Sequence, residues 1–136
     1  MRITKITLIR KKSNPSTSIN INDLLLQFGE SLGLFSSRDK DKSCYRIFII
    51  LIKALKANFE LSSDEIAIQT KLTRGTVIHH LNHLMDTGIV TSERGKYFIN
   101  FRNLNELVNQ MRKNVNSVFD DIENLAGEID SVLELN

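Results

Sequence analysis

The sequence predicts a mainly helical fold that carries one small β-hairpin and ends in a long helix. Three observations support this fold class. Apolar residues recur at helical spacing over much of the chain, residues 89–101 contain two short runs of β-type residues around a glycine, and residues 104–135 repeat apolar residues every three or four positions. The 136 residues are 41% apolar and 25% charged, which is the composition of an ordinary globular domain.

Composition excludes several classes of protein. The longest purely apolar run, Ile47–Ile52, has six residues, whereas a membrane-spanning helix needs about 20. The first residues lack the apolar core of a signal peptide. A single cysteine forms no internal disulfide and no Cys-rich zinc site. We therefore expect a cytoplasmic protein without a membrane partner.

The net charge of +2 hides an uneven distribution. Residues 1–102 contain 16 Lys/Arg and 9 Asp/Glu, and residues 103–136 contain 2 and 7. A basic body with an acidic tail permits one part of the molecule to bind a polyanion. The alternative is that charge simply fluctuates along the chain.

The N-terminal part is expected to form an arm and then a supporting helix. Residues 1–18 form the arm and linker, with a strand hint over residues 2–10 and the only proline in residues 13–18. Residues 19–42 contain the helix, expected over residues 21–34 with Asn22 as its cap, and the start of a charged loop over residues 36–43. Gly29 and Gly33 indicate either a close helix contact or a helix end at Gly33.

The next segment, Cys44–Lys56, is apolar on nearly every side and is too long for an average strand. A helix of this kind has to be covered on every side. We expect the cover to come from the 21–34 helix and from a second subunit. Cys44 is expected to be a packed core thiol.

Two short helices and a hairpin then follow. Ser62 or Ser63 is expected to cap the first helix. Its first turn carries Asp64 and Glu65, where the helix dipole favours acidic side chains. A tight turn at Lys71–Leu72 leads to a second helix that begins at Thr73 and is closed by Gly88. The two β-type runs, residues 89–93 and 97–101, meet at a turn in which Gly95 permits a tight hairpin.

This order of elements over residues 43–102 is that of a winged helix-turn-helix. In the second helix, Val77, Leu81 and Leu84 share one face that can pack on the domain. The opposite face presents the small and hydrogen-bonding side chains that a helix needs to contact base edges. These are Arg74, Gly75, Ile78, His79 and Asn82.

The segment LTRGTVIHHLNHLMDTGIV, residues 72–90, resembles the recognition-helix segment of ArsR-type winged helix-turn-helix transcriptional regulators. ERGKYFINFRNLNEL, residues 93–107, resembles the wing of that family and the start of its C-terminal dimerisation helix. The resemblance implies that the second helix enters the major groove and that the wing tip approaches a phosphate or the minor groove. The predicted DNA-binding residues are Thr73, Arg74, Gly75, Thr76, Ile78, His79, Asn82, Arg94 and Lys96. The wing cations have an alternative interpretation as a solvated turn.

Residues 103–136 are expected to form a coiled-coil-like helix about 48 Å long. Its apolar seam is interrupted by one stutter after Met111. The predicted dimer-interface residues are Leu107, Met111, Val115, Val118, Ile122, Leu125 and Ile129.

No metal or cofactor is expected. His79 and His83 lie one turn apart, but a metal site needs three or four ligands, and no further Cys, His or paired carboxylate lies nearby in the sequence. Metal-sensing members of the resembled family carry paired cysteines on the first helix of the motif, or His and Asp on the last helix. Here the first helix has no cysteine, and residues 104–136 have no histidine.

No catalytic motif is present, so we do not expect an enzyme. The leading interpretation is a homodimeric transcriptional regulator that binds double-stranded DNA sequence-specifically, with the recognition helix, residues 73–87, in the major groove and the wing, residues 89–101, at the backbone. The alternative is a winged-helix protein–protein adaptor, because the recognition helix has one Arg and no Lys.

Overall fold

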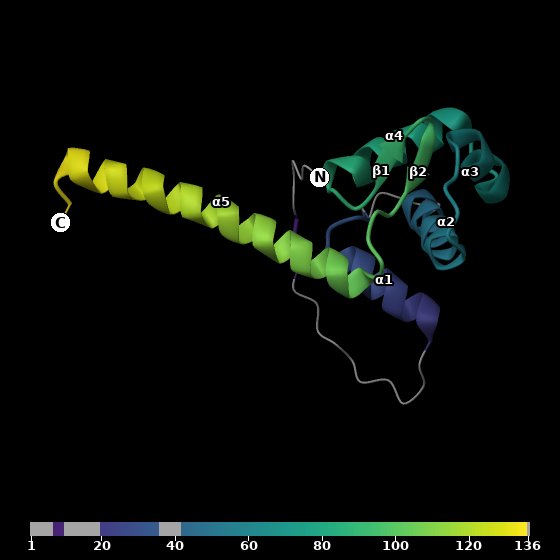
Figure 1. Cartoon of the computed structure of the whole chain (residues 1–136), viewed down its shortest axis with the longest axis horizontal. Coiled ribbons are helices and arrows are strands. Elements are labelled where there is room, and N and C mark those ends of the chain that lie inside the picture. The colour runs from purple at the N-terminus through teal and green to yellow at the C-terminus, as the bar shows by residue number, and fades with distance from the viewer. Residues whose placement is uncertain (1–6, 10–19, 36–41, 136) are drawn as a thin grey trace. The chain divides into compact units, whose positions relative to one another are not determined.

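The computed structural model describes residues 7–9, 20–35 and 42–135. The described chain is mainly helical, with one two-stranded antiparallel sheet (Figure 1). It divides into two compact units, residues 1–100 and residues 101–136. The first unit contains α1 (Ile21–Ser31), α2 (Ser43–Ala57), α3 (Ser63–Thr70), α4 (Arg74–Asp86), β1 (Thr91–Glu93) and β2 (Lys96–Phe98), and the second contains α5 (Leu104–Leu133). These elements confirm the predicted fold class.

The cap of α1 differs from the prediction. Asn20, not Asn22, caps the helix, because the Asn20 side-chain oxygen accepts the N–H of Asn22 at 3.0 Å. The helix ends where Gly33 adopts a positive φ of 67°, as one of the two interpretations of the glycine pair predicted. Gly29 also allows a close approach, since a Cβ there would lie 2.0 Å from the Phe35 ring.

The strand predicted over residues 2–10 is absent from the part that the structure describes. Thr7–Ile9 has no strand partner, and the Ile9 N–H donates instead to the carbonyl of Ser31 at the end of α1, at 2.8 Å. The rest of that strand, the linker over residues 13–18 and most of the loop over residues 36–43 lie outside the described residues.

The first unit is built around α2. Ile47, Phe48 and Leu51 are buried in its centre, and α2 contacts α1, α3, α4 and β2 (Figure 1). The Phe28 ring of α1 stacks on Phe48, with a centroid separation of 6.4 Å, so α1 supplies part of the predicted cover. Cys44 is buried, as expected of a core thiol.

The helix-turn-helix begins and ends where local sequence signals place it. Ser62 caps α3 in a reciprocal capping box with Glu65. Lys71 takes a left-handed conformation in the turn, and Thr73 caps α4 by accepting the Thr76 N–H at 3.2 Å. The hydroxyl of Thr70, which is buried at the end of α3, donates to the Ile66 carbonyl at 2.7 Å.

The hairpin is shorter than the two predicted β-runs. Arg94 and Gly95 form its turn with φ values of 53° and 77°, the two successive positive values of a type I′ turn. Ile89 and Val90 of the first run are buried and precede the strand instead of belonging to it. A bridge between Leu61 and Tyr97 joins the hairpin to the residues before α3.

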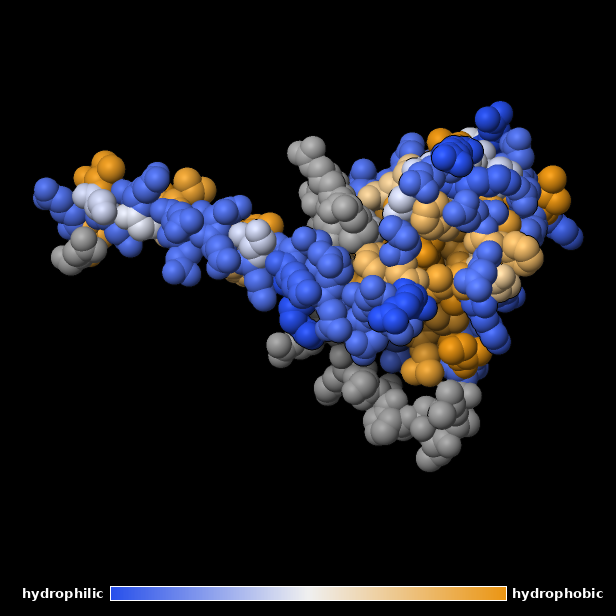
Figure 2. Space-filling view, viewed as in Figure 1, coloured by the Kyte–Doolittle hydropathy of each residue, from blue (hydrophilic) through white to orange (hydrophobic). Residues whose placement is uncertain are grey.

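The second unit is a single helix. Asn103 caps α5, and its side chain accepts the Glu106 N–H at 2.9 Å. Leu107 and Met111 are buried, whereas the apolar side chains from Val118 onward are exposed along one edge of the helix (Figure 2). We call these exposed residues the α5 stripe. They are Val118, Phe119, Ile122, Leu125, Ile129, Val132 and Leu133.

Candidate nucleic-acid interface

The two faces of α4 differ as predicted. Val77, Leu81 and Leu84 are completely buried. The opposite face is open to solvent: Arg74, Gly75, His79 and Asn82 are exposed, and Thr76 and Ile78 are half-buried. Helix α4 is thus fixed by one face and offers the other as a contact surface.

The start of α4 is held by two threonines. Thr73 Oγ1 accepts the backbone N–H of Thr76 and also lies 2.9 Å from Thr76 Oγ1, within hydrogen-bond distance. Both hydroxyls are therefore engaged in positioning the first turn. Gly75 lies beside them with no atom within 4 Å of a Cβ built on it, so nothing inside the protein requires a glycine there. The lack of a side chain leaves room at this point for an approaching molecule.

The three histidines of α4 have different environments. His79 is exposed, His80 is half-buried, and their rings meet edge to face with centroids 5.2 Å apart. His83 is half-buried in the last turn of the helix. Among the described residues, no three side chains of the His, Cys, Asp and Glu types are grouped to hold a metal ion.

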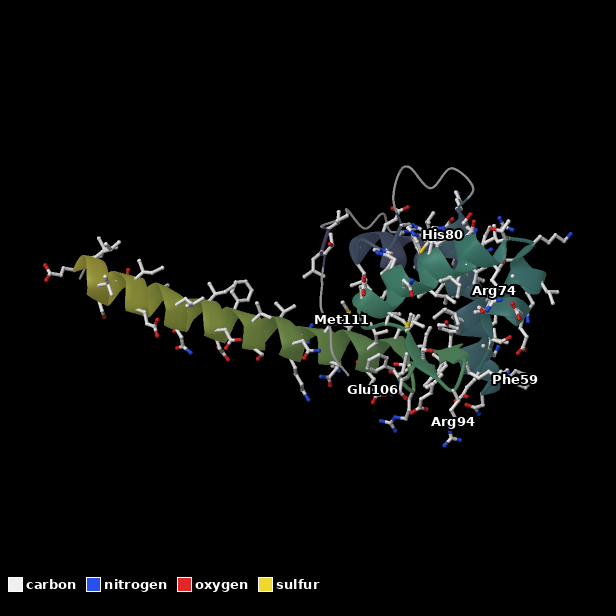
Figure 3. The ribbon with its side chains drawn as sticks, turned by 90° about the horizontal axis from the view of Figure 1, so that it is seen from above. Phe59, Arg74, His80, Arg94, Glu106 and Met111 are labelled. Atoms are coloured by element: carbon white, nitrogen blue, oxygen red, sulfur yellow. The ribbon has the colours of Figure 1, made fainter. Side chains whose placement is uncertain are left out.

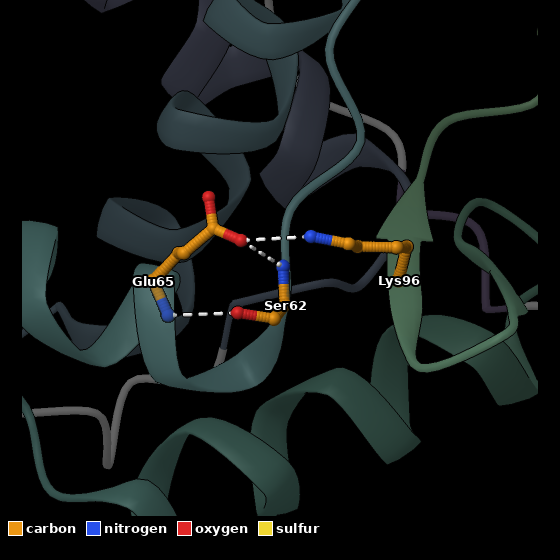
Figure 4. A network of polar contacts seen from close by, with 3 residues as sticks. All are labelled: Ser62, Glu65 and Lys96. Carbon is orange, nitrogen blue, oxygen red and sulfur yellow. Dashed lines mark hydrogen bonds and ion pairs between the residues drawn. The ribbon is translucent and has the colours of Figure 1, made fainter.

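The two wing cations also differ from each other. Arg94 is exposed at the turn and projects away from the hairpin (Figure 3). Lys96 forms an ion pair inside the chain, with its Nζ 3.0 Å from Glu65 Oε1 (Figure 4). Arg94 makes no ion pair within the described ranges of the chain.

A second ion pair involves the neighbouring acid in the first turn of α3, Asp64. Arg74 Nε approaches Asp64 Oδ1 at 3.6 Å, with both side chains about 70% exposed (72% and 70%). The Lys96 ammonium lowers the pKa of Glu65 below its usual range, and hydrogen bonds from Ser62 lower it further. Two of the predicted DNA-binding cations are thus paired with the two acids at the start of α3.

The pairing of these acids is what sequence reasoning missed. Asp64 and Glu65 were assigned only to the dipole of α3. The signal in the sequence is weak, because Glu65 and Lys96 are 31 positions apart. Their contact depends on how the hairpin lies against α3.

None of the described helices is both long enough and apolar enough to cross a membrane.

Comparison with known proteins identifies the helix-turn-helix. Residues 49–92 match the family model described as bacterial regulatory protein, arsR family. The match runs from within α2 through α3 and α4 to β1, and covers less than half of the chain. No curated protein and no solved structure matched the chain. The function of this family is DNA-binding transcription regulation. Residues 49–92 are therefore similar to the helix-turn-helix of arsR-type regulators, and the β1–β2 hairpin that follows completes a winged helix-turn-helix fold.

Proposed function

We propose that the protein binds duplex DNA sequence-specifically as a homodimer, with α4 in the major groove and the β1–β2 hairpin at the backbone. The observation that carries this proposal is the division of α4 into a buried apolar face and an exposed face of small and hydrogen-bonding side chains. The major groove admits an α-helix and displays a distinct donor and acceptor pattern for each base pair.

The exposed residues suit different parts of the DNA. The Arg74 side chain is of the type that forms two hydrogen bonds with the edge of a guanine, and the Asn82 side chain is of the type that forms two with the edge of an adenine. Thr73 and Thr76 hold the helix start, and the free wing cation Arg94 suits a phosphate. Lys96 is also a phosphate ligand once it leaves Glu65. Gly75, Ile78 and His79 complete the proposed contact surface.

The α5 stripe supports a second copy of the chain as the partner. Five of its residues repeat at intervals of four, three, four and three positions, which is the spacing of a coiled-coil seam: Val118, Ile122, Leu125, Ile129 and Val132. Two-fold homodimers are the commonest soluble oligomers. Such a dimer presents two recognition helices to two half-sites about 34 Å apart on the duplex. The proposed interface comprises the α5 stripe together with the predicted residues Leu107, Met111 and Val115.

The experiment that tests DNA recognition is selection of bound sequences from a pool of random duplexes. We expect an enriched pseudo-palindrome whose half-sites are one helical turn apart. Asn82→Ala is the matched variant: loss of one base contact should relax selection at one position of each half-site while leaving the rest of the motif intact. A pool that shows no enrichment after repeated rounds contradicts sequence-specific binding.

The second candidate is an adaptor that binds protein through the same face. One observation favours it: residues 73–87 contain one Arg and no Lys, and that Arg74 is paired with Asp64. Retention on immobilised random duplex DNA, measured over a range of salt concentrations, separates the two functions. Retention that weakens steeply with salt supports DNA binding, and no retention at low salt supports the adaptor.

A further inference from the structure

We propose that Asp64 and Glu65, which we call the acidic turn, hold Arg74 and Lys96 away from phosphate and thereby limit binding to non-specific DNA. This inference rests on the proposed function and assigns the acidic turn a role in specificity. Neither acid contacts DNA in the proposal. Each acts through the cation with which it is paired.

The geometry brings both cations to one point of the fold. Arg74 begins α4 and Lys96 begins β2, yet their partners are neighbours in the first turn of α3. The acidic turn thus neutralises a cation of the recognition helix and a cation of the wing. Among the predicted cationic DNA ligands, Arg94 alone has no ion pair with a described residue.

Glu65 is the better fixed of the two acids. Its backbone N–H donates to Ser62 Oγ at 3.1 Å, and its Oε1 accepts the Ser62 N–H at 3.3 Å as well as the Lys96 ammonium at 3.0 Å (Figure 4). The capping box therefore keeps the carboxylate pointed at Lys96. Asp64 belongs to no capping box, and its longer, more exposed pair with Arg74 is the weaker restraint.

The consequence for DNA follows from charge. A phosphate that binds Lys96 has to share the ammonium with Glu65 or displace it, and in either case the carboxylate lies close to the phosphate and repels it. Non-specific binding depends almost entirely on phosphate contacts, so it carries this cost without compensation. Specific binding has base contacts in addition, so it persists at salt concentrations at which the same cost abolishes non-specific binding.

Two isosteric substitutions release the cations one at a time. Glu65→Gln removes the charge that holds Lys96 but keeps an oxygen that can accept the Ser62 N–H, because glutamine also serves in a capping box. Asp64→Asn removes the charge that holds Arg74 and keeps a side chain of nearly the same size. The control is Glu60→Gln, which removes one negative charge from the exposed surface just before α3 and leaves both the Asp64–Arg74 and the Glu65–Lys96 pairs in place.

The measurement is the dissociation constant for a random-sequence duplex over a series of salt concentrations. An exposed ion pair is worth little, so we expect Glu65→Gln to bind about 1.5- to 5-fold more tightly than wild type at low salt. The slope of log K against log salt should steepen by up to about 0.9 for a cation newly free to bind phosphate. Asp64→Asn should act in the same direction and more weakly, and Glu60→Gln should match wild type.

A double-mutant cycle with Lys96→Gln tests whether Glu65 acts through Lys96. We expect Lys96→Gln to weaken random-duplex binding more in the Glu65→Gln background than in the wild-type background. Additive effects, or a Glu65→Gln variant that binds no more tightly than Glu60→Gln, overturn the inference while the wild type still binds DNA. A wild type and variants that all fail to bind duplex DNA overturn the proposed function itself.

Discussion

Replacing Ile122 with aspartate tests the proposed dimer most directly. Ile122 lies in the middle of the α5 stripe and is 52% exposed in the single chain. In a two-fold dimer the substitution occurs twice, once in each copy. It removes an apolar contact and places a charge in the seam, and we expect it to shift the protein from dimer to monomer.

The exposure of Ile122 sets the magnitude. Fully burying an isoleucine stabilises by about 1.5–3 kcal/mol. Because Ile122 is already about half-buried, roughly half of that gain remains for each copy in the dimer interface. Over the two copies the remaining gain is about 1.5–3 kcal/mol. Desolvating a polar group without a partner costs about 1–3 kcal/mol for each copy. The total is at least about 3.5 kcal/mol, which corresponds to a dissociation constant raised by a factor of about 300 or more.

Sedimentation or light scattering over a dilution series measures this shift. Asn124→Asp is the control, because it adds the same charge in the same helix turn but off the α5 stripe, and it should leave the dimer intact. We expect Ile122→Asp also to lose tight DNA binding, since one winged helix makes few phosphate contacts. A wild type that is monomeric at micromolar concentration refutes the reasoning, as does an Ile122→Asp variant that dimerises like Asn124→Asp.

Four further results are expected. Arg74→Ala should weaken binding to the selected duplex by about 1–3 kcal/mol, measured by titration with the helical content unchanged. Gly127→Ala should stabilise α5 by about 1 kcal/mol in thermal unfolding followed by circular dichroism, because its added Cβ meets no atom within 4 Å. Gly29→Ala should destabilise the first unit, since its Cβ would clash with the ring of Phe35; an unchanged denaturation midpoint would contradict that contact. Because the pKa of Glu65 is lowered in the folded state, its contribution to stability is present above the usual glutamate range and is lost as the pH falls through the lowered value, so the pH dependence of unfolding should flatten in Glu65→Gln.

The sequence predicted best those features that depend on neighbouring residues. The caps at Ser62 and Thr73 and the hairpin glycine, Gly95, are confirmed because each acts within a few positions of the chain. The cap of α1 was misplaced by two residues, because the sequence there offers Asn20 and Asn22 in succession and only the geometry shows which side chain accepts.

Features that depend on packing were predicted less well. Ile89 and Val90 have the residue types of a strand, but both are buried before β1 begins. The acidic first turn of α3 was recognised, but not the cations that reach it from α4 and β2. Those contacts join residues that only the folded chain brings together. The binding role of the exposed face of α4 stays a prediction, since its residues have been located but not seen with a ligand.

The attachment of the wing decides how the acidic-turn variants can be interpreted. A two-stranded hairpin is marginally stable by itself. Here Tyr97, the residue after Lys96, donates its N–H to the Leu61 carbonyl at 2.7 Å and accepts the Leu61 N–H at 3.2 Å. These backbone bonds hold the hairpin beside the start of α3 and do not involve the Glu65 carboxylate. Loss of the Lys96–Glu65 pair therefore frees a charge without releasing the wing, so a change in the salt dependence of DNA binding reports the charge and not the fold.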